Sequence, residues 1–237
     1  MLGEKNIEQT DSPQMREWFM NPDDDQSTPK PYCNSLRFLY FPPLEKFDKA
    51  CHELYCDHRV MIPFVPQLYQ MELSAVLERR RKQRETALKT TLFVDVVEKS
   101  TGKFVGVTGF REFISDTSKN VPAYSHTGYQ GHEDPTLNFV RTAEFGVLIS
   151  FQYQRKGICT EAFFEMIRFG KQHLNCAEVK GVTLPNNLPM CNFFTKFGLI
   201  FIEKLYLDGL PNDDCKKQEE WMVFRGNIDH ILSNYGK

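Results

Sequence analysis

The spacing of apolar residues changes from one segment of this chain to the next, and each spacing predicts a different element. Alternating or continuous apolar residues over a short stretch are typical of strands, whereas apolar residues one helical turn apart are typical of helices. We therefore predict strands at residues 36–41, 91–97, 104–113, 143–150, 178–184, 199–207 and 220–224. The helical spacing predicts helices at residues 44–57, 67–88, 163–169, 189–197 and 228–232.

These elements follow one another in the order β-α-α-β-β-β-α-β-α-β-β, which predicts an α/β fold with one mixed sheet. The short polar segment Ser100–Lys103 separates two predicted strands, so we expect at least that pair to be antiparallel. We assign the folded domain to residues 35–226. The polar residues 1–34 are expected to form a mobile N-terminal arm, and residues 227–237 a C-terminal tail.

Residues 115–141 interrupt the periodic pattern and are rich in serine, asparagine, proline, glycine, histidine and tyrosine. A loop of this length inside a compact domain is usually functional or disordered. As a functional loop it could cover an acceptor site, and His126 or His132 within it could act as a base. A disordered surface loop is an equal alternative.

Composition narrows the class of protein. The chain is 41% hydrophobic and 25% charged, as in ordinary globular proteins. Its net charge of −2 argues against a dedicated nucleic-acid-binding protein, and no apolar run is long enough to span a membrane. Seven cysteines without the spacing of a disulfide framework, and no signal peptide, favour free thiols and a cytoplasmic location, with the nucleus as an alternative.

The most informative segment lies between a predicted strand and a predicted helix. Residues 154–162 read Gln-Arg-Lys-Gly-Ile-Cys-Thr-Glu-Ala. A helix that begins there directs unpaired backbone N–H groups and the positive end of its dipole towards the loop. Such a helix terminus binds anions, phosphates above all. The segment is neither a Walker A loop nor a Rossmann fingerprint, because it lacks the additional glycines of both motifs.

Together with a later segment, this loop resembles the GNAT acetyltransferase superfamily, and most of all its branch that acetylates the N-termini of ribosomal proteins. Gln154, Gly157 and Cys159 match the three fixed positions of the family's Gln/Arg-x-x-Gly-x-Gly/Ala loop. Residues 187–199 correspond to the family's Asn-x-x-Ser…Lys-Leu-Gly-Phe segment. The order of elements agrees as well. The resemblance covers residues 35–226 and implies a GNAT-like fold and an N-acetyltransferase that uses acetyl-CoA.

The resemblance also implies how acetyl-CoA is held. Its pyrophosphate is expected at the backbone N–H groups of the loop, where a glycine allows close approach and basic side chains add charge. Its pantetheine arm is expected to pair with the edge of the preceding strand. The implied binding residues are Leu148, Ile149, Ser150, Gln154, Arg155, Lys156, Gly157, Ile158, Cys159, Thr160 and Asn187.

Glu144, near the start of that strand, is the candidate base that takes a proton from the amine acceptor, directly or through a water. The alternative is a structural carboxylate, for example one paired with Arg141. An α-amine, with a pKa of about 7.8, is easier to deprotonate at neutral pH than a lysine at about 10.4. The expected acceptor is therefore a protein N-terminus or a small amine of low pKa.

The chain departs from the family pattern at two positions. Phe194 stands where many relatives have a tyrosine that protonates the CoA thiolate, and Met190 stands where the ribosomal branch often has a serine. Tyr153, Tyr206 or water are alternatives for the acid. The departures keep open a second function, that of a non-catalytic acyl-CoA-binding or scaffold protein of the same fold. An unrelated nucleotide-binding protein is a third.

Two further clusters have simpler interpretations. Residues 51–58 contain cysteines and histidines, but their spacing does not match a metal site, so no metal is expected. Residues 79–84, Arg-Arg-Arg-Lys-Gln-Arg, lie late in the second predicted helix, where we expect a solvated face. Contact with an acidic acceptor or a nuclear-import signal are the alternatives. The predicted apolar face of this helix consists of Leu68, Met71, Leu73, Val76 and Leu77.

Overall fold

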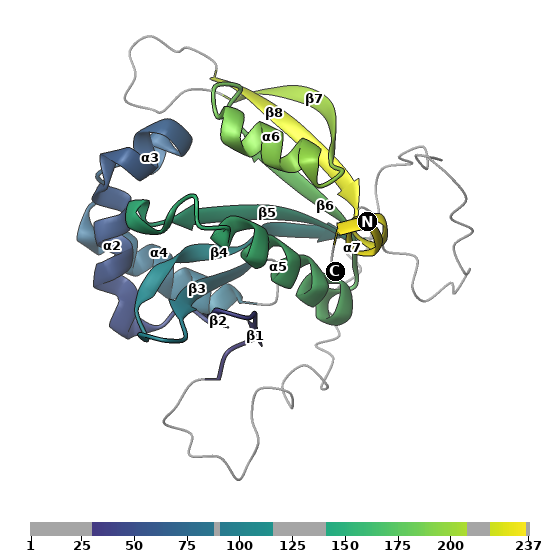
Figure 1. Cartoon of the computed structure of the whole chain (residues 1–237). Coiled ribbons are helices and arrows are strands. Elements are labelled where there is room, and N and C mark those ends of the chain that lie inside the picture. The colour runs from purple at the N-terminus through teal and green to yellow at the C-terminus, as the bar shows by residue number, and fades with distance from the viewer. Residues whose placement is uncertain (1–29, 88–90, 116–140, 208–218, 236–237) are drawn as a thin grey trace, which may run out of the picture.

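The computed structural model describes residues 30–87, 91–115, 141–207 and 219–235 of the chain. At the centre of the described residues lies an eight-stranded sheet in the order β1-β2-β3-β4-β5-β6-β8-β7 (Figure 1). Neighbouring strands are antiparallel except β5 and β6, which are parallel. The strands are β1 (Cys33–Asn34), β2 (Phe38–Phe41), β3 (Leu92–Glu98), β4 (Phe104–Ser115), β5 (Arg141–Ile149), β6 (Cys176–Thr183), β7 (Ile200–Leu207) and β8 (Glu219–Asn227). The predicted mixed α/β fold is confirmed.

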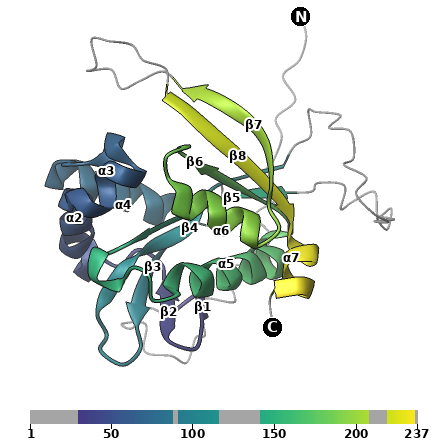
Figure 2. The same ribbon diagram turned by 45° about the horizontal axis from the view of Figure 1, so that its top comes forward.

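Helices pack on both faces of this sheet (Figures 1 and 2). They are α2 (Asp48–Cys56), α3 (His58–Phe64), α4 (Leu73–Thr86), α5 (Ile158–Leu174), α6 (Leu188–Lys196) and α7 (Ile228–Tyr235), with short 3-10 turns η1 (Glu45–Phe47), η2 (Pro66–Leu68) and η3 (Phe151–Tyr153). On one face Phe145 of β5 meets Phe163 of α5, and on the other Asp95 of β3 binds Arg80 of α4. None of the helices in the described residues has the length and apolarity to cross a bilayer.

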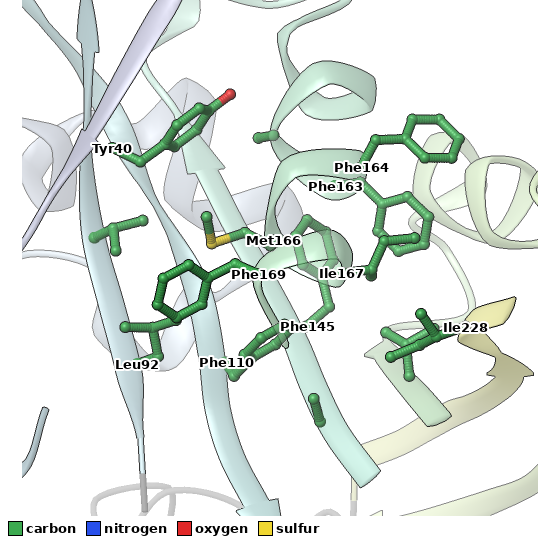
Figure 3. Packing of buried hydrophobic residues seen from close by; sticks show 14 of the residues in the cluster. Tyr40, Leu92, Phe110, Phe145, Phe163, Phe164, Met166, Ile167, Phe169 and Ile228 are labelled. Carbon is green, nitrogen blue, oxygen red and sulfur yellow. The ribbon is translucent and has the colours of Figure 1, made fainter. Parts of the chain in front are cut away.

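The main hydrophobic core lies between α5 and the middle of the sheet (Figure 3). The apolar side of α5 presents Phe163, Met166 and Ile167, all fully buried, to the strands. The Phe163 ring contacts Phe145 edge-on at a centroid separation of 5.1 Å. Gly170 brings α5 close to the sheet, because an added Cβ at this position would lie 2.9 Å from the ring of Phe110. The predicted amphipathic run after the loop therefore forms the centre of the core.

The boundaries of the predicted domain shift at both ends. Residues 33–34, assigned to the mobile arm 1–34, form β1 and pair with β2. Residues 228–235 of the predicted tail 227–237 form α7, whose Ile228 and Ile231 are fully buried, so this helix belongs to the domain. Residues 1–29 of the arm and residues 116–140 of the predicted insertion lie outside the described residues.

A helix that the sequence did not predict, α3, follows α2 directly. The side chain of Asp57 accepts a hydrogen bond from the backbone N–H of Arg59 and so caps its N-terminus. Pro63 lies near its end, and the helix stops one residue later. Val60 and Met61 bury against α2 and α4 in a second core cluster.

The basic run of α4 is only in part the solvated face that we predicted, since Arg81 and Lys82 are exposed but Arg80 is not. Arg80 is only 1% exposed. Its guanidinium donates two hydrogen bonds to Asp95, at 2.6 and 2.8 Å, and a third to Asp48 of α2. It also donates to the carbonyl of Leu44 at 2.9 Å. A charge can be buried in this way because carboxylates from two other elements meet it.

The predicted apolar face is confirmed in part. Val76 belongs to the second core cluster, and Leu68 and Met71, which precede α4, pack against that cluster. Leu73 and Leu77 are 43% and 42% exposed, whereas Val76 is buried beside Arg80. The helix is thus rotated so that a polar contact, rather than a leucine stripe, faces the sheet.

We predict that Arg80→Met lowers the free energy of unfolding by about 3–5 kcal/mol, because Asp95 and Asp48 would keep buried carboxylates without their cation. Urea denaturation monitored by circular dichroism measures this change. Arg81→Met on the same helix is the matched control, since Arg81 is exposed and pairs only with Glu78 and Glu85. An equal loss in both variants would contradict the assigned role of Arg80.

Candidate active site

The parallel strands β5 and β6 pair over only part of their lengths. Their ladder ends at Phe145 and Gly181, although both strands continue. An added Cβ at Gly181 would lie 2.3 Å from the ring of Phe194, so α6 packs directly on the backbone of β6. The neighbouring ring of Phe193 contacts Phe163 of α5 at 5.3 Å. Aromatic rings thus fill the space between α5 and α6 where the two strands separate. In the described part of the chain, the β6-facing edge of residues 146–149 has no strand partner.

A cavity of about 600 Å³ opens where the strands separate. Its walls come from α2, α3, α4, β3, β4, β5, the start of α5, the end of β6, α6 and Trp221 of β8. The cavity therefore joins a free strand edge to a helix N-terminus.

The loop before α5 contains two left-handed backbone conformations, at Arg155 (φ 59°) and Gly157 (φ 78°). The first helical hydrogen bond runs from the N–H of Glu161 to the carbonyl of Gly157. The N–H groups of the preceding residues 158–160 therefore have no acceptor within the helix. Cys159 lies in this first helical turn and needs no left-handed backbone, and burial raises the pKa of its thiol to about 12. It is a neutral packing residue.

A network from the N-terminal strands holds this loop in place. Arg37 donates from its backbone N–H and from its Nε to the two oxygens of Glu161, each at 2.8 Å, and from Nη2 to the carbonyl of Lys156 at 2.9 Å. Ser35 donates a short hydrogen bond to the same carboxylate. Burial alone would raise the pKa of Glu161, but the hydrogen bonds from Ser35 and Arg37 hold it below its usual value. The sequence reasoning missed this network.

Glu144 lies on the cavity wall with its side chain 12% exposed. Its carboxylate pairs with Lys180 at 2.9 Å and with Arg111 at 3.2 Å. The structural partner that we suggested, Arg141, donates instead to the carbonyl of Leu174 at 3.4 Å. Glu144 is therefore a carboxylate between two cations.

The structure brings most of the predicted binding residues to the cavity. The lining includes Leu148, Ile149, Gln154, Arg155, Gly157, Ile158, Cys159, Thr160 and Asn187. Ser150 and Lys156 do not line it. The amide of Ser150 donates to Val105, and the ammonium of Lys156 lies 5.4 Å from the ring centroid of Tyr153.

Two of these residues already make structural hydrogen bonds. Gln154 donates from Nε2 to the carbonyl of Ile149 at 3.0 Å and so joins the loop to the end of β5. Asn187 caps α6 by accepting from the N–H of Met190, and its Nδ2 donates to Thr183 at 2.9 Å. Both hold the cavity in shape at its rim.

The residues considered as proton donors to the CoA thiolate differ in whether they line the cavity. Phe194 is 1% exposed beneath Gly181, and Tyr206 is 58% exposed on β7 and does not line the cavity. Tyr153 lines it, as does Tyr55, which the sequence reasoning did not consider. Burial raises the pKa of Tyr55 to about 12.

The sequence reasoning also missed Arg111 and Trp221 as cavity residues. Neither lies in a recognisable motif. Each is placed at the cavity by the pairing of its strand with the neighbouring strands, which local sequence does not encode.

The cysteine and histidine side chains of residues 51–58 do not point to a common site. Cys51 is buried in the second core cluster, whereas Cys56 is exposed and contacts His52 at 3.6 Å. Among the described residues, no group of three or more potential metal ligands comes together.

Comparisons with known proteins agree with this geometry. A family profile described as an acetyltransferase (GNAT) domain matches residues 38–200. No curated protein sequence matches the chain. A GNAT-family acetyltransferase from Bacillus anthracis is similar in structure, with a TM-score of 0.59 at 17% identity, over 83% of this chain and 98% of that one.

Two further solved structures are similar. RimL, a ribosomal L7/L12 alpha-N-protein acetyltransferase in complex with coenzyme A, has a TM-score of 0.64 at 9% identity, over 85% of this chain and 99% of that one. Spermidine N-acetyltransferase from Vibrio cholerae, in complex with CoA and spermine, has a TM-score of 0.61 at 12% identity, over 82% and 98%. At such identities the likeness establishes the fold.

We predict that Arg37→Ala speeds amide hydrogen exchange in residues 155–161, because the loop would lose its contacts to Glu161 and to the Lys156 carbonyl. Exchange followed by mass spectrometry on the ligand-free protein measures this. Lys171→Ala, which removes an exposed ion pair with Asp229 at the other end of α5, is the control. Unchanged exchange in the loop of the Arg37 variant would show that the network does not order it.

Proposed function

The chain belongs to the GNAT acetyltransferase family, and we propose that it transfers the acetyl group of acetyl-CoA to an amine by direct attack in a ternary complex. The observation that carries this proposal is the cavity at the separation of β5 and β6. It combines an unpaired strand edge, a helix N-terminus with free N–H groups, and the carboxylate of Glu144. The strand edge and the helix N-terminus suit a thioester that carries a pyrophosphate, and the carboxylate suits an amine that must lose a proton.

The residues present fit acetyl-CoA. The N–H groups of residues 158–160 and the dipole of α5 would bind the pyrophosphate, with Arg155 adding charge and Thr160 a hydroxyl. Gly157 leaves the backbone open, since its missing Cβ meets only the Arg37 side chain, at 3.6 Å. The free edge at Leu148 and Ile149 would pair with the amide groups of pantetheine. An N–H of this edge would also stabilise the oxyanion of the tetrahedral intermediate.

Glu144 is the proposed base. It would take a proton from the ammonium of the acceptor, directly or through a water. The neutral nitrogen then forms a bond to the carbonyl carbon, and the tetrahedral intermediate gives its second nitrogen proton to water. The carbon–sulfur bond breaks, and the departing thiolate takes a proton from water or from Tyr153, which water then reprotonates. Phe194 cannot supply that proton, which is why Tyr153 becomes the proposed acid.

The proposed acceptor is an amine of low pKa, such as a protein N-terminus or a small-molecule amine. Similar structures include enzymes whose names specify a ribosomal protein N-terminus and spermidine. Only one carboxylate lines the described cavity, which favours an acceptor with a single reactive amine over a polyamine.

We expect release of the CoA thiol when the protein, acetyl-CoA and a panel of peptide and small amines are combined. Glu144→Gln should lower kcat by about 100-fold or more, because the base is lost while size and polarity remain. Glu178→Gln is the matched control on β6, where the carboxylate binds Thr142 outside the cavity. Full turnover by the Glu144 variant would eliminate this base. Binding of CoA with no thiol release for any amine would favour the non-catalytic alternative.

We expect calorimetric titration to show CoA binding with preference over ATP, and Gly157→Ala to weaken it by about tenfold or more, because the loop needs a left-handed residue there. Gly102→Ala is the matched control, since Gly102 is also left-handed (φ 66°) but lies in the β3–β4 turn with nothing within 4 Å of an added Cβ. Equal affinity for ATP, or equal losses in both variants, would contradict the proposed binding mode.

A further inference from the structure

The basic run of α4 contains one cation that differs from all the others. Arg80 and Arg84 pair with Asp48, Arg80 also with Asp95, and Arg81 and Lys82 pair with glutamates of the same helix. Arg79 has no carboxylate partner among the described residues. It is also the member of the run that lines the cavity.

The surroundings of Arg79 are those of a cation that lacks its anion. Its Nε is buried and has no hydrogen-bond partner in the described part of the chain. The guanidinium lies 6.0 Å from the ring centroid of Phe93, and its hydrogen-bonding neighbour on α2 is the neutral side chain of Tyr55, which leaves its charge uncompensated. A buried guanidinium donor without a partner is costly, and an anion would supply the missing acceptor.

A second cation, Arg111, reaches the same face of the sheet. It follows Phe110, whose ring packs against α5, so its own side chain points to the opposite face, where α4 lies. Glu144 precedes Phe145, which also faces α5, and the ion pair between Glu144 and Arg111 confirms the shared face. The side chain of Arg111 runs over Gly146. A Cβ added at Gly146 would lie 3.6 Å from the Cγ of Arg111.

The charges of the residues that line the cavity do not balance. Glu144 is its only carboxylate among the described lining residues, and it is shared between Arg111 and Lys180. With Arg79 unpaired, positive charge is in excess. Trp221, 5% exposed on β8, adds an indole N–H without a partner among the described residues. The described lining therefore carries more cations than carboxylates and two donors without partners, Arg79 Nε and the Trp221 indole.

From this arrangement we infer that the acceptor carries an anionic group, a carboxylate or a phosphate, close to its amine, and that Arg79 binds that anion, with Arg111 as a second cation of the same cavity. The inference rests on the proposed function and specifies its substrate class. A guanidinium presents paired N–H donors that match both kinds of anion. The same excess charge disfavours the protonated form of the bound amine, which assists the step assigned to Glu144. It also repels polyamines.

Matched acceptors test this inference on the full chain. The first pair consists of peptides that differ only in beginning with Asp or Asn, and the second of phosphoethanolamine and ethanolamine. We expect kcat/KM to favour the anionic member of at least one pair by about tenfold, mainly through KM. The peptide pair and the small-molecule pair distinguish an acidic N-terminus from a small zwitterion as the source of the anion.

Substitutions of Arg79 test whether this residue causes the preference for anionic acceptors. Arg79→Gln should reduce the preference for the anionic acceptor to about one, and Arg79→Lys should restore part of it. Lys82→Gln, which removes a cation from the same helix outside the cavity, should leave the preference intact. A preference unchanged in Arg79→Gln, or faster turnover of spermidine than of every anionic acceptor, would overturn the inference.

Calorimetric binding of the same acceptors to the CoA-saturated protein separates this inference from the proposed function. If no amine releases CoA but the anionic acceptors bind and Arg79→Gln loses that binding, the anion site stands and the proposed catalysis fails. If amines are acetylated with no dependence on their anion or on Arg79, the catalysis stands and the inference fails. If the anionic acceptors neither bind nor react, the inference is wrong.

Discussion

The guanidinium of Arg80 is the contact on which one half of this molecule depends. It joins α4 to α2 through Asp48, to β3 through Asp95 and to the chain before α2 through the Leu44 carbonyl. Because Arg80 must face the sheet, its neighbour Arg79 is turned towards the cavity, and the leucines of the helix turn outwards. A structural ion pair thus determines which residue of the basic run is available to a ligand.

The other half depends on aromatic packing. Phe163, Phe193 and Phe194 fill the wedge between α5 and α6, and Gly181 lets one of those rings lie directly on β6. The wedge separates β5 from β6 beyond their fifth paired position, which exposes the strand edge and the start of α5 to the same cavity. The two halves meet at Glu144, whose strand is packed by α5 on one face and approached by α4 on the other.

Local sequence was sufficient to predict the elements that have regular apolar spacing and the loop before α5. It was insufficient wherever a polar contact overrides that spacing. The sequence around Arg80 predicts a solvated cation, because its partners Asp48 and Asp95 lie in two other elements. Arg111 and Trp221 reach the cavity through the pairing of whole strands, and Arg37 reaches the loop across 124 residues. Such contacts depend on tertiary register, which short-range patterns do not contain.

The large sequence separation between Arg37 and Glu161 has a consequence for the folding of this domain. Glu161 and the Lys156 carbonyl meet their partner only after β2 has joined the sheet and α5 has docked on it. Contacts between residues so far apart in sequence form late, because the intervening chain must first be ordered. A loop ordered by such a contact reaches its final shape only in the completed domain. A ligand that binds there therefore stabilises the whole fold against unfolding, and partly folded chains do not compete for it.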